Sequence, residues 1–293
     1  MSPAALVRLG ALVLGVFVVW RVVGVPVAGR PVTGDLLIRD LEPARKVVSE
    51  CRGPAPTIVG AAIILGANTG PGPEGVDPAW TQLSRSPHLK VFVEPIPTIF
   101  DALVRNLRTV RNHVAINAAI RTSGGSPNLT MYCIGDPTDL NNLGAHNYSW
   151  LSGTCSTVRS RLFHGYDMAH RASRAEIASK IREFTVRALT IDRLLEVARV
   201  PLDQIAYVQT DVEGLDDQVV LALPFSDRRF RPRTVVWEHV LFGDAVTTRV
   251  NGFLEAHSYT ICRRAQNMVA TRRRPGPDPT TAAAVRVVED RQL

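Results

Sequence analysis

Five short apolar runs recur along the chain with helical segments between them, and this alternation limits the possible fold more than any other feature. Each run is nearly continuous, which is typical of a strand buried on both faces. Alternating strands and helices predict an α/β fold with a mostly parallel sheet and helices on both faces. The runs span residues 57–65, 90–93, 114–117, 205–210 and 234–238, and the expected helices span 97–107, 191–200, 214–222 and 245–256.

Other segments interrupt or flank this alternation. Residues 118–188 are rich in Gly, Ser and Asn and contain short strand-like pieces, so we interpret them as an insertion. Residues 258–262 and 267–271 predict an antiparallel pair at the sheet edge. Because 45% of the 293 residues are hydrophobic, wholesale disorder is excluded. The expected organisation is an N-terminal hydrophobic segment (1–30), a neck with a helix at 40–50 (31–56), a main domain (57–271) and a flexible tail (272–293).

The N-terminus is apolar or glycine throughout residues 9–20. Extended to Ala28, this segment has twenty residues and spans about 30 Å as a helix, the thickness of a hydrocarbon core. We therefore predict a single-pass signal-anchor helix that attaches the protein to a membrane, with a luminal domain in the endomembrane system. A cleaved signal peptide is the alternative, although Pro26 would then occupy the third position before the cleavage site.

Cysteine and charge content bear on compartment and partners. The four cysteines are Cys51, Cys133, Cys155 and Cys262. They lack C-x-x-C spacing, so they form one or two disulfides in a luminal domain or are small buried apolar residues. Glycosylation triplets at Asn128 and Asn147 agree with a luminal domain. The net charge of +7 comes with no basic stripe interleaved with aromatics, so we expect no nucleic-acid partner.

Polar residues follow the first three apolar runs. The first run ends in the turn Gly66-Ala-Asn68-Thr-Gly70, where glycine lets the backbone approach a ligand that a side chain would block. The second ends at Glu94, whose carboxylate could accept hydrogen bonds from both ribose hydroxyls of an adenosine ligand. The third ends at Asn117, whose amide could read the adenine edge or serve as a plain turn residue.

Acids and a histidine follow the last two runs. Asp211 and Glu213 come one residue apart after the fourth run, and burial of both in a core would be costly. Their spacing places them on the same side of an extended chain, where their negative field suits a cation such as a sulfonium. A metal is conceivable there, but the spacing does not demand one. His239 follows the fifth run, and its neutral imidazole is a candidate base near pH 7.

A glycine string at Gly70–Gly75 also satisfies G-x-G-x-x-G, the pattern of a dinucleotide-binding turn. Pro71 and Pro73 within it remove N–H donors that a pyrophosphate would need, and no clear helix opens there. A nicotinamide-dependent oxidoreductase is therefore a minor alternative.

Taken in order, these motifs resemble the FkbM-type family of S-adenosylmethionine-dependent methyltransferases over about residues 57–271. The order and spacing of the motifs agree, and G-A-N-x-G, E-P-x-P and D-x-E-G together are quite specific. The matching segments are ILGANTG ending at Gly70, FVEPIPTIFDALVRNL (92–107), VAINAAI (114–120), LTIDRLL (189–195), TDVEGLD (210–216) and VVWEH (235–239).

The resemblance implies a class I, Rossmann-like methyltransferase fold with a mostly parallel seven-stranded sheet, in which the last strand of the chain is antiparallel. It also implies S-adenosyl-L-methionine as cofactor and methyl transfer to an oxygen, often a hydroxyl of a sugar or natural product. By position, the resemblance places three residues near the methionine part of the cofactor, Glu94 at the ribose, Asn117 at the adenine and Asp211 at the sulfonium. The three residues are Gly66, Asn68 and Gly70.

The sequence thus predicts a membrane-anchored O-methyltransferase whose acceptor is a glycan or a small molecule. His239 would take the acceptor's proton, Asp211 and Glu213 would shape the site, and the insertion would form the acceptor pocket. Two departures from the family leave an alternative open. Ile64 stands where the family usually has an acid, and Gln209 where it commonly has a lysine, so the protein could be a catalytically silent binding module.

Overall fold

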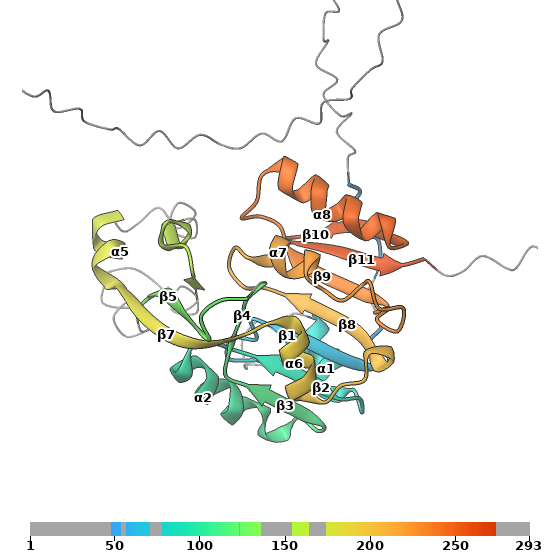
Figure 1. Ribbon diagram of the computed structural model, residues 1–293, viewed down its shortest axis with the longest axis horizontal. Helices are drawn as coiled ribbons and strands as arrows, with labels where there is room; N and C mark the ends of the chain where they lie inside the picture. Colours follow the sequence, from blue (N-terminus) through green and yellow to red (C-terminus); the bar gives the residue numbers. More distant parts are fainter. Residues whose placement is uncertain are drawn as a thin grey trace, which may run out of the picture. The chain divides into compact units, whose positions relative to one another are not determined.

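The computed structural model describes residues 48–53, 57–70, 78–122, 124–135, 154–163 and 174–273 (Figure 1). The predicted signal-anchor helix, most of the neck and the tail beyond Arg273 lie outside these residues. Within the described residues, no helix has both the length and the apolar character needed to cross a bilayer.

A seven-stranded sheet forms the centre of the fold, with the strand order β10-β11-β9-β8-β1-β2-β3. Neighbouring strands are parallel except at β11, which is antiparallel to both β9 and β10. The expected mixed α/β fold with a mostly parallel sheet is therefore confirmed. The strands are β1 (Ala61–Leu65), β2 (Lys90–Val93), β3 (His113–Ile116), β8 (Ile205–Thr210), β9 (Thr234–Glu238), β10 (Tyr259–Arg264) and β11 (Asn267–Arg272).

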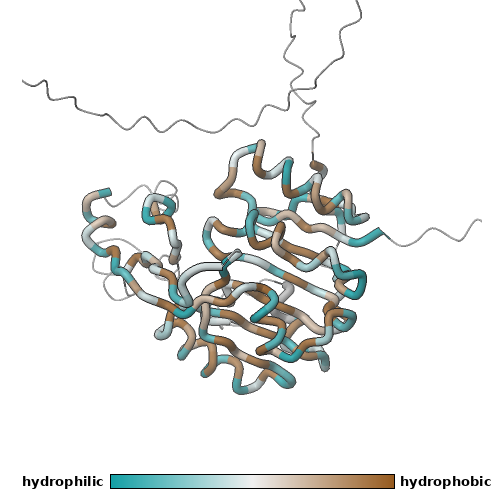
Figure 2. The backbone as a smooth tube through the Cα atoms, viewed as in Figure 1, coloured by the Kyte–Doolittle hydropathy of each residue, from teal (hydrophilic) through white to brown (hydrophobic). Residues whose placement is uncertain are grey.

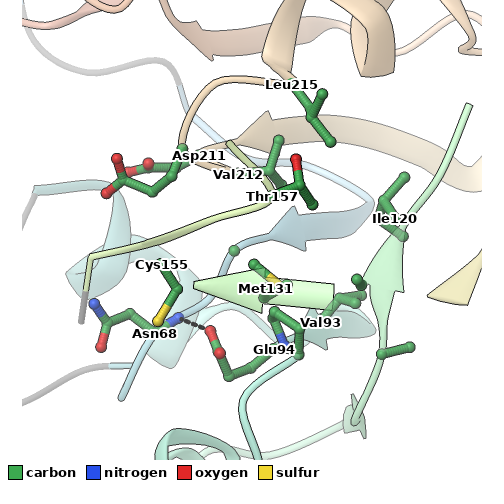
Figure 3. A pocket seen from close by; sticks show the side chains of 15 residues that line it. Asn68, Val93, Glu94, Ile120, Met131, Cys155, Thr157, Asp211, Val212 and Leu215 are labelled. Carbon is green, nitrogen blue, oxygen red and sulfur yellow. Dashed lines mark hydrogen bonds between the residues drawn. The ribbon is translucent and has the colours of Figure 1, made fainter. Parts of the chain in front are cut away.

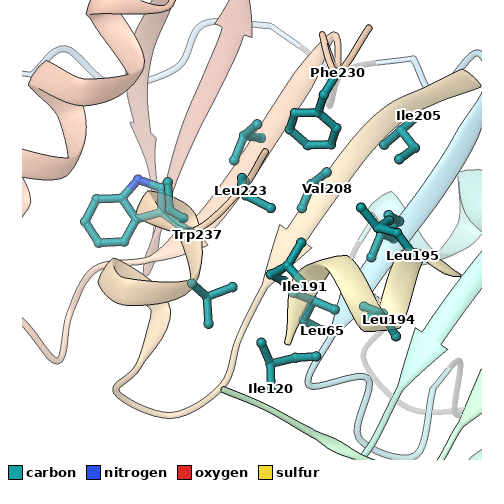
Figure 4. Packing of buried hydrophobic residues seen from close by; sticks show 14 of the residues in the cluster. Leu65, Ile120, Ile191, Leu194, Leu195, Ile205, Val208, Leu223, Phe230 and Trp237 are labelled. Carbon is teal, nitrogen blue, oxygen red and sulfur yellow. The ribbon is translucent and has the colours of Figure 1, made fainter. Parts of the chain in front are cut away.

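Helices cover both faces of this sheet, because side chains of a buried strand alternate between its two faces. On β1, Leu65 belongs to the core under α6, α7 and α8 (Figure 4), as does Ile63. Ile64 belongs instead to the core under α1 and α2. Figure 2 shows the strands as mostly hydrophobic. The helices are α1 (Pro78–Arg85), α2 (Pro97–Asn106), α6 (Ile191–Ala198), α7 (Asp216–Leu221) and α8 (Asp244–Ala256).

The helix α6 shows how the sequence sets these elements. Thr190 caps its N-terminus by accepting a hydrogen bond from the N–H of Arg193 at 3.3 Å. Its apolar residues recur at helical spacing and are buried against the sheet at Ile191, Leu194, Leu195 and Ala198. In contrast, α1 was not expected, since eight residues carry only a short helical pattern.

The insertion forms its own four-stranded sheet, in the order β4-β7-β5-β6. Here β5 pairs antiparallel with both β6 and β7, and a disulfide joins Cys133 on β5 to Cys155 on β6. At nine residues, β7 is longer than the short pieces that the sequence indicated. The elements are β4 (Ala119–Ile120), β5 (Asn128–Ile134), β6 (Cys155–Ser156), the 3₁₀ helix η3 (Arg159–Arg161), α5 (Arg174–Lys180) and β7 (Ile181–Leu189).

The expected helix over 40–50 is wrong at its C-terminal end. Residues 48–50 run extended beside β10, and Glu50 forms a parallel β-bridge with Arg263. The Cys51–Cys262 disulfide and the hydrogen bond from Cys51 N–H to the Arg263 carbonyl, 2.8 Å long, fix this pairing. With this bond all four cysteines are paired, so buried free thiols, the other alternative, are ruled out.

Candidate functional site

The tips of β1 and β8 touch at the carboxyl edge of the sheet. Gly66 follows β1 with a φ of +78°, and a Cβ at this position would lie 1.7 Å from the carbonyl oxygen of Asp211. The N–H of Asp211 in turn donates to the carbonyl of Leu65 at 2.9 Å. Only glycine fits such a contact, so the first glycine of the turn is what allows β8 to bring Asp211 beside it.

Glu94 joins the tips of β1 and β2. Its carboxylate accepts a hydrogen bond from the backbone N–H of Asn68 at 3.0 Å (Figure 3) and another from the backbone N–H of Ile96 at 2.9 Å. The side chain is buried, and this burial raises its pKa to about 7 despite the two backbone donors. Glu94 therefore shapes the turn after β1 as well as presenting a carboxyl group to the site.

The turn after β8 is built around a buried aspartate, Asp216. Its carboxylate accepts hydrogen bonds from the Thr210 hydroxyl at 2.7 Å, the Val212 N–H at 3.1 Å and the Gly214 N–H at 3.3 Å. Asp216 is fully buried, and its N–H partners fold the chain back over it. Glu213 consequently adopts a left-handed φ of +53°. Asp216 was not among the site residues expected from the sequence, although an aspartate at the start of a helix after a glycine turn is a known local signal.

Four carboxyl groups lie close enough at this edge to affect one another, and we call Asp211, Glu213, Asp216 and Glu238 the acid cluster. Burial, and then the charges of Asp211 and Asp216, raise the pKa of Glu213 to about 8. Burial, and then the charges of Asp211 and Glu213, raise the pKa of Glu238 to about 9. Both glutamates therefore hold protons at neutral pH. A cation bound beside them would lower both pKa values and so favour release of these protons.

A cavity opens between these strand tips and the insertion (Figure 3). The main sheet and its turns contribute Gly66, Asn68, Val93, Glu94, Pro95, Asp211, Val212, Glu213 and Leu215. The insertion contributes Ala118, Ala119, Ile120, Met131, Cys155 and Thr157. Its volume is about 90 Å³, smaller than the roughly 300 Å³ or more of typical small-molecule sites. A nucleoside-sized ligand would therefore require the wall to move outward.

The wall formed by β6 is attached directly to the acidic turn. The hydroxyl of Ser156 donates a hydrogen bond of 2.7 Å to the carbonyl of Glu213, and it accepts one from the N–H of Val158. The disulfide between Cys133 and Cys155 ties the same strand to β5. The insertion thus forms one wall of the cavity. A hydrogen bond joins this wall to the backbone of Glu213, and a disulfide joins β6 to β5 within the sheet of the insertion.

The structure brings five of the predicted site residues to this one cavity, namely Gly66, Asn68, Glu94, Asp211 and Glu213. Gly70 does not line it and closes the turn instead, with a hydrogen bond of 3.0 Å to the carbonyl of Ala67. Asn117 lies just outside the lining, where its amide donates to the carbonyls of Glu94 and Pro95. This amide organises the turn after β2, and its oxygen alone could still accept a hydrogen bond.

His239 also lies outside the lining of the cavity. Burial lowers its pKa, the charge of Arg263 adds to this effect, and its ring hydrogen-bonds the backbone of Ala265. Its imidazole is therefore neutral near pH 7, as a base requires, but it packs against the β10–β11 hairpin. Among the described residues, no group of three or more His, Cys, Asp or Glu side chains is arranged to hold a metal ion.

Comparison with known proteins identifies no family, since no family profile and no curated protein matches the chain. Among solved structures, the chain is similar to precorrin-6y C5,15-methyltransferase from Geobacter metallireducens, with a TM-score of 0.31 and 12% sequence identity. The alignment covers 74% of this chain and 67% of that one. A TM-score this low indicates a distant likeness only, so the geometry of the cavity has to support any functional proposal.

Proposed function

We propose that this chain is an S-adenosylmethionine-dependent methyltransferase of the FkbM type that methylates a hydroxyl oxygen of a glycan or small molecule. One observation carries the proposal. Gly66, Glu94 and Asp211, which lie far apart in the sequence, line a single cavity at the carboxyl ends of neighbouring parallel strands. Open α/β sheets bind nucleotide-like ligands at such a place.

The residues present fit this cofactor. Gly66 presents bare backbone to the cavity, and the charge of Asp211, which helps to raise the pKa of Glu213, would offset a positively charged sulfur. Glu94 has two carboxylate oxygens, each with acceptor capacity beyond its one backbone donor. When bound, the cofactor would supply an electrophilic methyl group.

For the acceptor's proton, Glu213 is better placed than His239. Glu213 lines the cavity, whereas the imidazole of His239 packs against the neighbouring hairpin. A carboxylate with a pKa of about 8 accepts a proton far more readily than an ordinary one. In our proposal Glu213 loses its own proton beside the positive charge of the bound cofactor and then, as a carboxylate, takes the proton of the acceptor's hydroxyl. The apolar wall formed by Ile120, Met131 and Leu215 excludes water.

Calorimetric titration of the full-length chain with S-adenosylmethionine and with S-adenosylhomocysteine tests this function. The two ligands differ in the charge on sulfur, so Asp211→Asn should weaken binding of the sulfonium compound by about tenfold and that of the neutral one much less. Asp101→Asn, an exposed change on α2, is the matched control and should alter neither. If the wild-type chain binds neither ligand, the proposal fails.

The catalytically silent alternative rested on Ile64 and Gln209. In the structure neither residue lines the cavity, because Ile64 is buried in the core under α1 and α2 and Gln209 accepts a hydrogen bond from the Tyr207 hydroxyl at 2.8 Å. Neither departure therefore removes a group from the wall of the site. Methyl transfer by the wild-type chain, measured with a radiolabelled methyl group, would exclude the silent module.

We also infer that the domain faces an oxidising compartment, as a luminal domain anchored at a membrane would. Two disulfides support this inference, because such bonds persist mainly outside the cytosol. Asn128, the first residue of the glycosylation triplet on β5, is exposed and so open to modification. Mass spectrometry of the chain after alkylation without a reducing agent should find no free thiol; four alkylated cysteines would contradict the inference.

A further inference from the structure

The peptide unit between Glu213 and Gly214 is held at both of its polar groups. Its carbonyl oxygen, which belongs to Glu213, accepts a hydrogen bond of 2.7 Å from the hydroxyl of Ser156 on β6. Its N–H, which belongs to Gly214, donates to the carboxylate of Asp216 at 3.3 Å. Ser156 belongs to the insertion and Asp216 to the main domain, so both parts of the chain fix this one peptide.

The backbone of Glu213 needs such contacts because its conformation is unusual. Its φ of +53° lies in the left-handed region, which a residue with a long side chain rarely adopts. A conformation of this kind costs free energy and persists only where the surrounding structure fixes it. In this conformation the side chain of Glu213 lines the cavity, so the contacts that fix the backbone also decide where the carboxyl group lies.

Ser156 is suited to fix this backbone. It is buried, and its hydroxyl oxygen accepts a hydrogen bond of 3.1 Å from the N–H of Val158. A hydroxyl has one proton, so while its oxygen accepts from Val158 its proton is donated to the Glu213 carbonyl. The neighbouring disulfide between Cys133 and Cys155 holds β6, the strand that carries Ser156. The hydroxyl therefore has a fixed position and a fixed direction.

A second side chain of the insertion covers the same peptide. Arg161 on η3 packs so closely on Gly214 that a Cβ there would lie 2.3 Å from its Nη1. The guanidinium carbon of Arg161 also lies 5.0 Å from the centre of the Phe242 ring, a contact that stabilises its position. The peptide consequently has little room to rotate away from Ser156.

We propose that Ser156 is a positioning residue for the proposed reaction, because its hydroxyl holds the Glu213 backbone in the conformation that places the carboxyl group in the cavity. The inference rests on the proposed function, in which Glu213 takes the proton of the acceptor's hydroxyl. Through this one hydrogen bond, the insertion both forms a wall of the cavity and sets the position of the base.

Loss of this hydrogen bond should change how Glu213 titrates. Burial is the largest cause that raises its pKa to about 8, above the ordinary value of 4.5. If the carboxyl group turns toward water when the Ser156 hydroxyl is removed, this pKa should fall. The charged groups around Glu213 are Asp211 in the same turn, Asp216 on α7, Glu238 on β9 and Arg161 on η3.

Titration of the Glu213 carboxyl group in the full-length chain tests this role without any ligand. The chain is produced with isotope-labelled glutamate, the carboxyl signals are followed by NMR against pH, and Glu213→Gln identifies the signal of interest. We expect this signal to titrate near pH 8 in the wild type. In Ser156→Ala it should titrate at least about one pH unit lower.

Ser179→Ala is the matched control. The hydroxyl of Ser179 also donates to a glutamate carbonyl, that of Glu176 at 2.6 Å, but it lies on the exposed surface of α5. This change should leave the titration of Glu213 as it is. Ser156→Thr and Ser156→Val are two variants of nearly equal size that differ in the hydroxyl, and they serve if Ser156→Ala does not fold. Ser156→Thr should titrate as the wild type does, and Ser156→Val at lower pH.

A purely structural role of Ser156 would lower the melting temperature of Ser156→Ala and leave the titration of Glu213 unchanged, and this result would overturn the proposal. A Glu213 that titrates as an ordinary glutamate in the wild type, or an equal shift in Ser156→Thr and Ser156→Val, would overturn it as well.

Calorimetry with S-adenosylmethionine separates this proposal from the proposed function. Measured in two buffers that differ in their enthalpy of ionisation, binding should release more protons from the wild type than from Ser156→Ala, and equal release would contradict the proposal. If the wild-type chain binds no cofactor, the methyltransferase is refuted, whereas the NMR titration still decides whether Ser156 positions Glu213.

Discussion

At the residue scale, the site depends on a few positions whose backbone or charge is unusual. Gly66 and Gly214 have positive φ values, a Cβ on Gly66 would collide with the Asp211 carbonyl, and Glu213, directly before Gly214, adopts a left-handed conformation. Beside them, Glu213 and Glu238 carry protons that ordinary glutamates lose well below neutral pH. Strained backbone and shifted pKa values at one edge of a sheet are typical of functional sites.

Gly66→Ala tests the contact between β1 and β8. The new methyl group would collide with the Asp211 carbonyl, so we expect the free energy of unfolding to fall by about 2–4 kcal/mol. Chemical denaturation measures this change, and calorimetry should find cofactor binding lost. Gly252→Ala, in α8 with nothing near its Cβ position, is the control and should be neutral or slightly stabilising. An equal loss in both variants would contradict the contact.

The raised pKa values of Glu213 and Glu238 predict how stability depends on pH. Each folded pKa lies above the ordinary glutamate value of 4.5, so the folded state binds more protons than the unfolded state between about pH 4.5 and 9. The stabilisation is complete below that range and is lost as pH rises through it. Denaturation curves should show the wild type losing stability as pH rises through this range, and Glu238→Gln losing clearly less. A parallel pH dependence in the two proteins would be contrary evidence.

At the element scale, the acidic turn and α7 form a unit organised by Asp216. The carboxylate of Asp216 holds three donors from Thr210, Val212 and Gly214, so the turn keeps its shape independently of a ligand. Ser156 then attaches β6 to the same turn. The elements at the carboxyl edge are therefore linked, and the insertion cannot move away without breaking the bond to Glu213.

Asp216→Ala should release this unit. Three donors would lose their acceptor inside the protein, so we expect a loss of about 2–4 kcal/mol in the free energy of unfolding. Hydrogen exchange should rise at the N–H groups of Val212 and Gly214. Asp101→Ala, on the exposed face of α2, is the control and should change stability by less than about 0.5 kcal/mol. Unchanged exchange at the two N–H groups would show that Asp216 does not hold the turn.

At the scale of the whole molecule, two disulfides act over very different spans of chain. Cys51–Cys262 joins residues 211 positions apart and ties the segment before the first strand to the last hairpin. Cys133–Cys155 closes a separation of 22 and stays within the insertion. The first therefore constrains the whole domain, whereas the second constrains only the wall of the cavity.

Replacing Cys51 and Cys262 by serine should lower the free energy of unfolding by about 4–5 kcal/mol, because the longer cross-link restricts the unfolded chain more. Replacing Cys133 and Cys155 should cost about 3 kcal/mol but should weaken ligand binding more, since Cys155 lines the cavity. Thermal unfolding and calorimetry measure the two effects. If replacement of Cys51 and Cys262 weakened ligand binding more than replacement of Cys133 and Cys155, the role of the insertion as a wall of the cavity would be contradicted.

The sequence by itself determined the elements and much of the site. Continuous apolar runs specify strands buried on both faces, and helical spacing specifies α2, α6 and α8, because these patterns are local. Since parallel strands place their carboxyl ends on one edge, the sequence also predicted that Gly66, Glu94 and Asp211 would meet. The sequence did not predict helix α1, because its eight residues are too few to show a clear helical spacing of apolar residues.

Only the tertiary structure decided which polar residues face the cavity. Glu213 lines it and His239 packs against a hairpin, although both follow a strand, because the turn around Asp216 redirects the chain. The pairing of Cys51 with Cys262 and the position of Arg161 over Gly214 likewise depend on segments distant in sequence. Burial and proximity set these properties, including the raised pKa values of Glu94, Glu213 and Glu238, and both arise only when the packed chain excludes water.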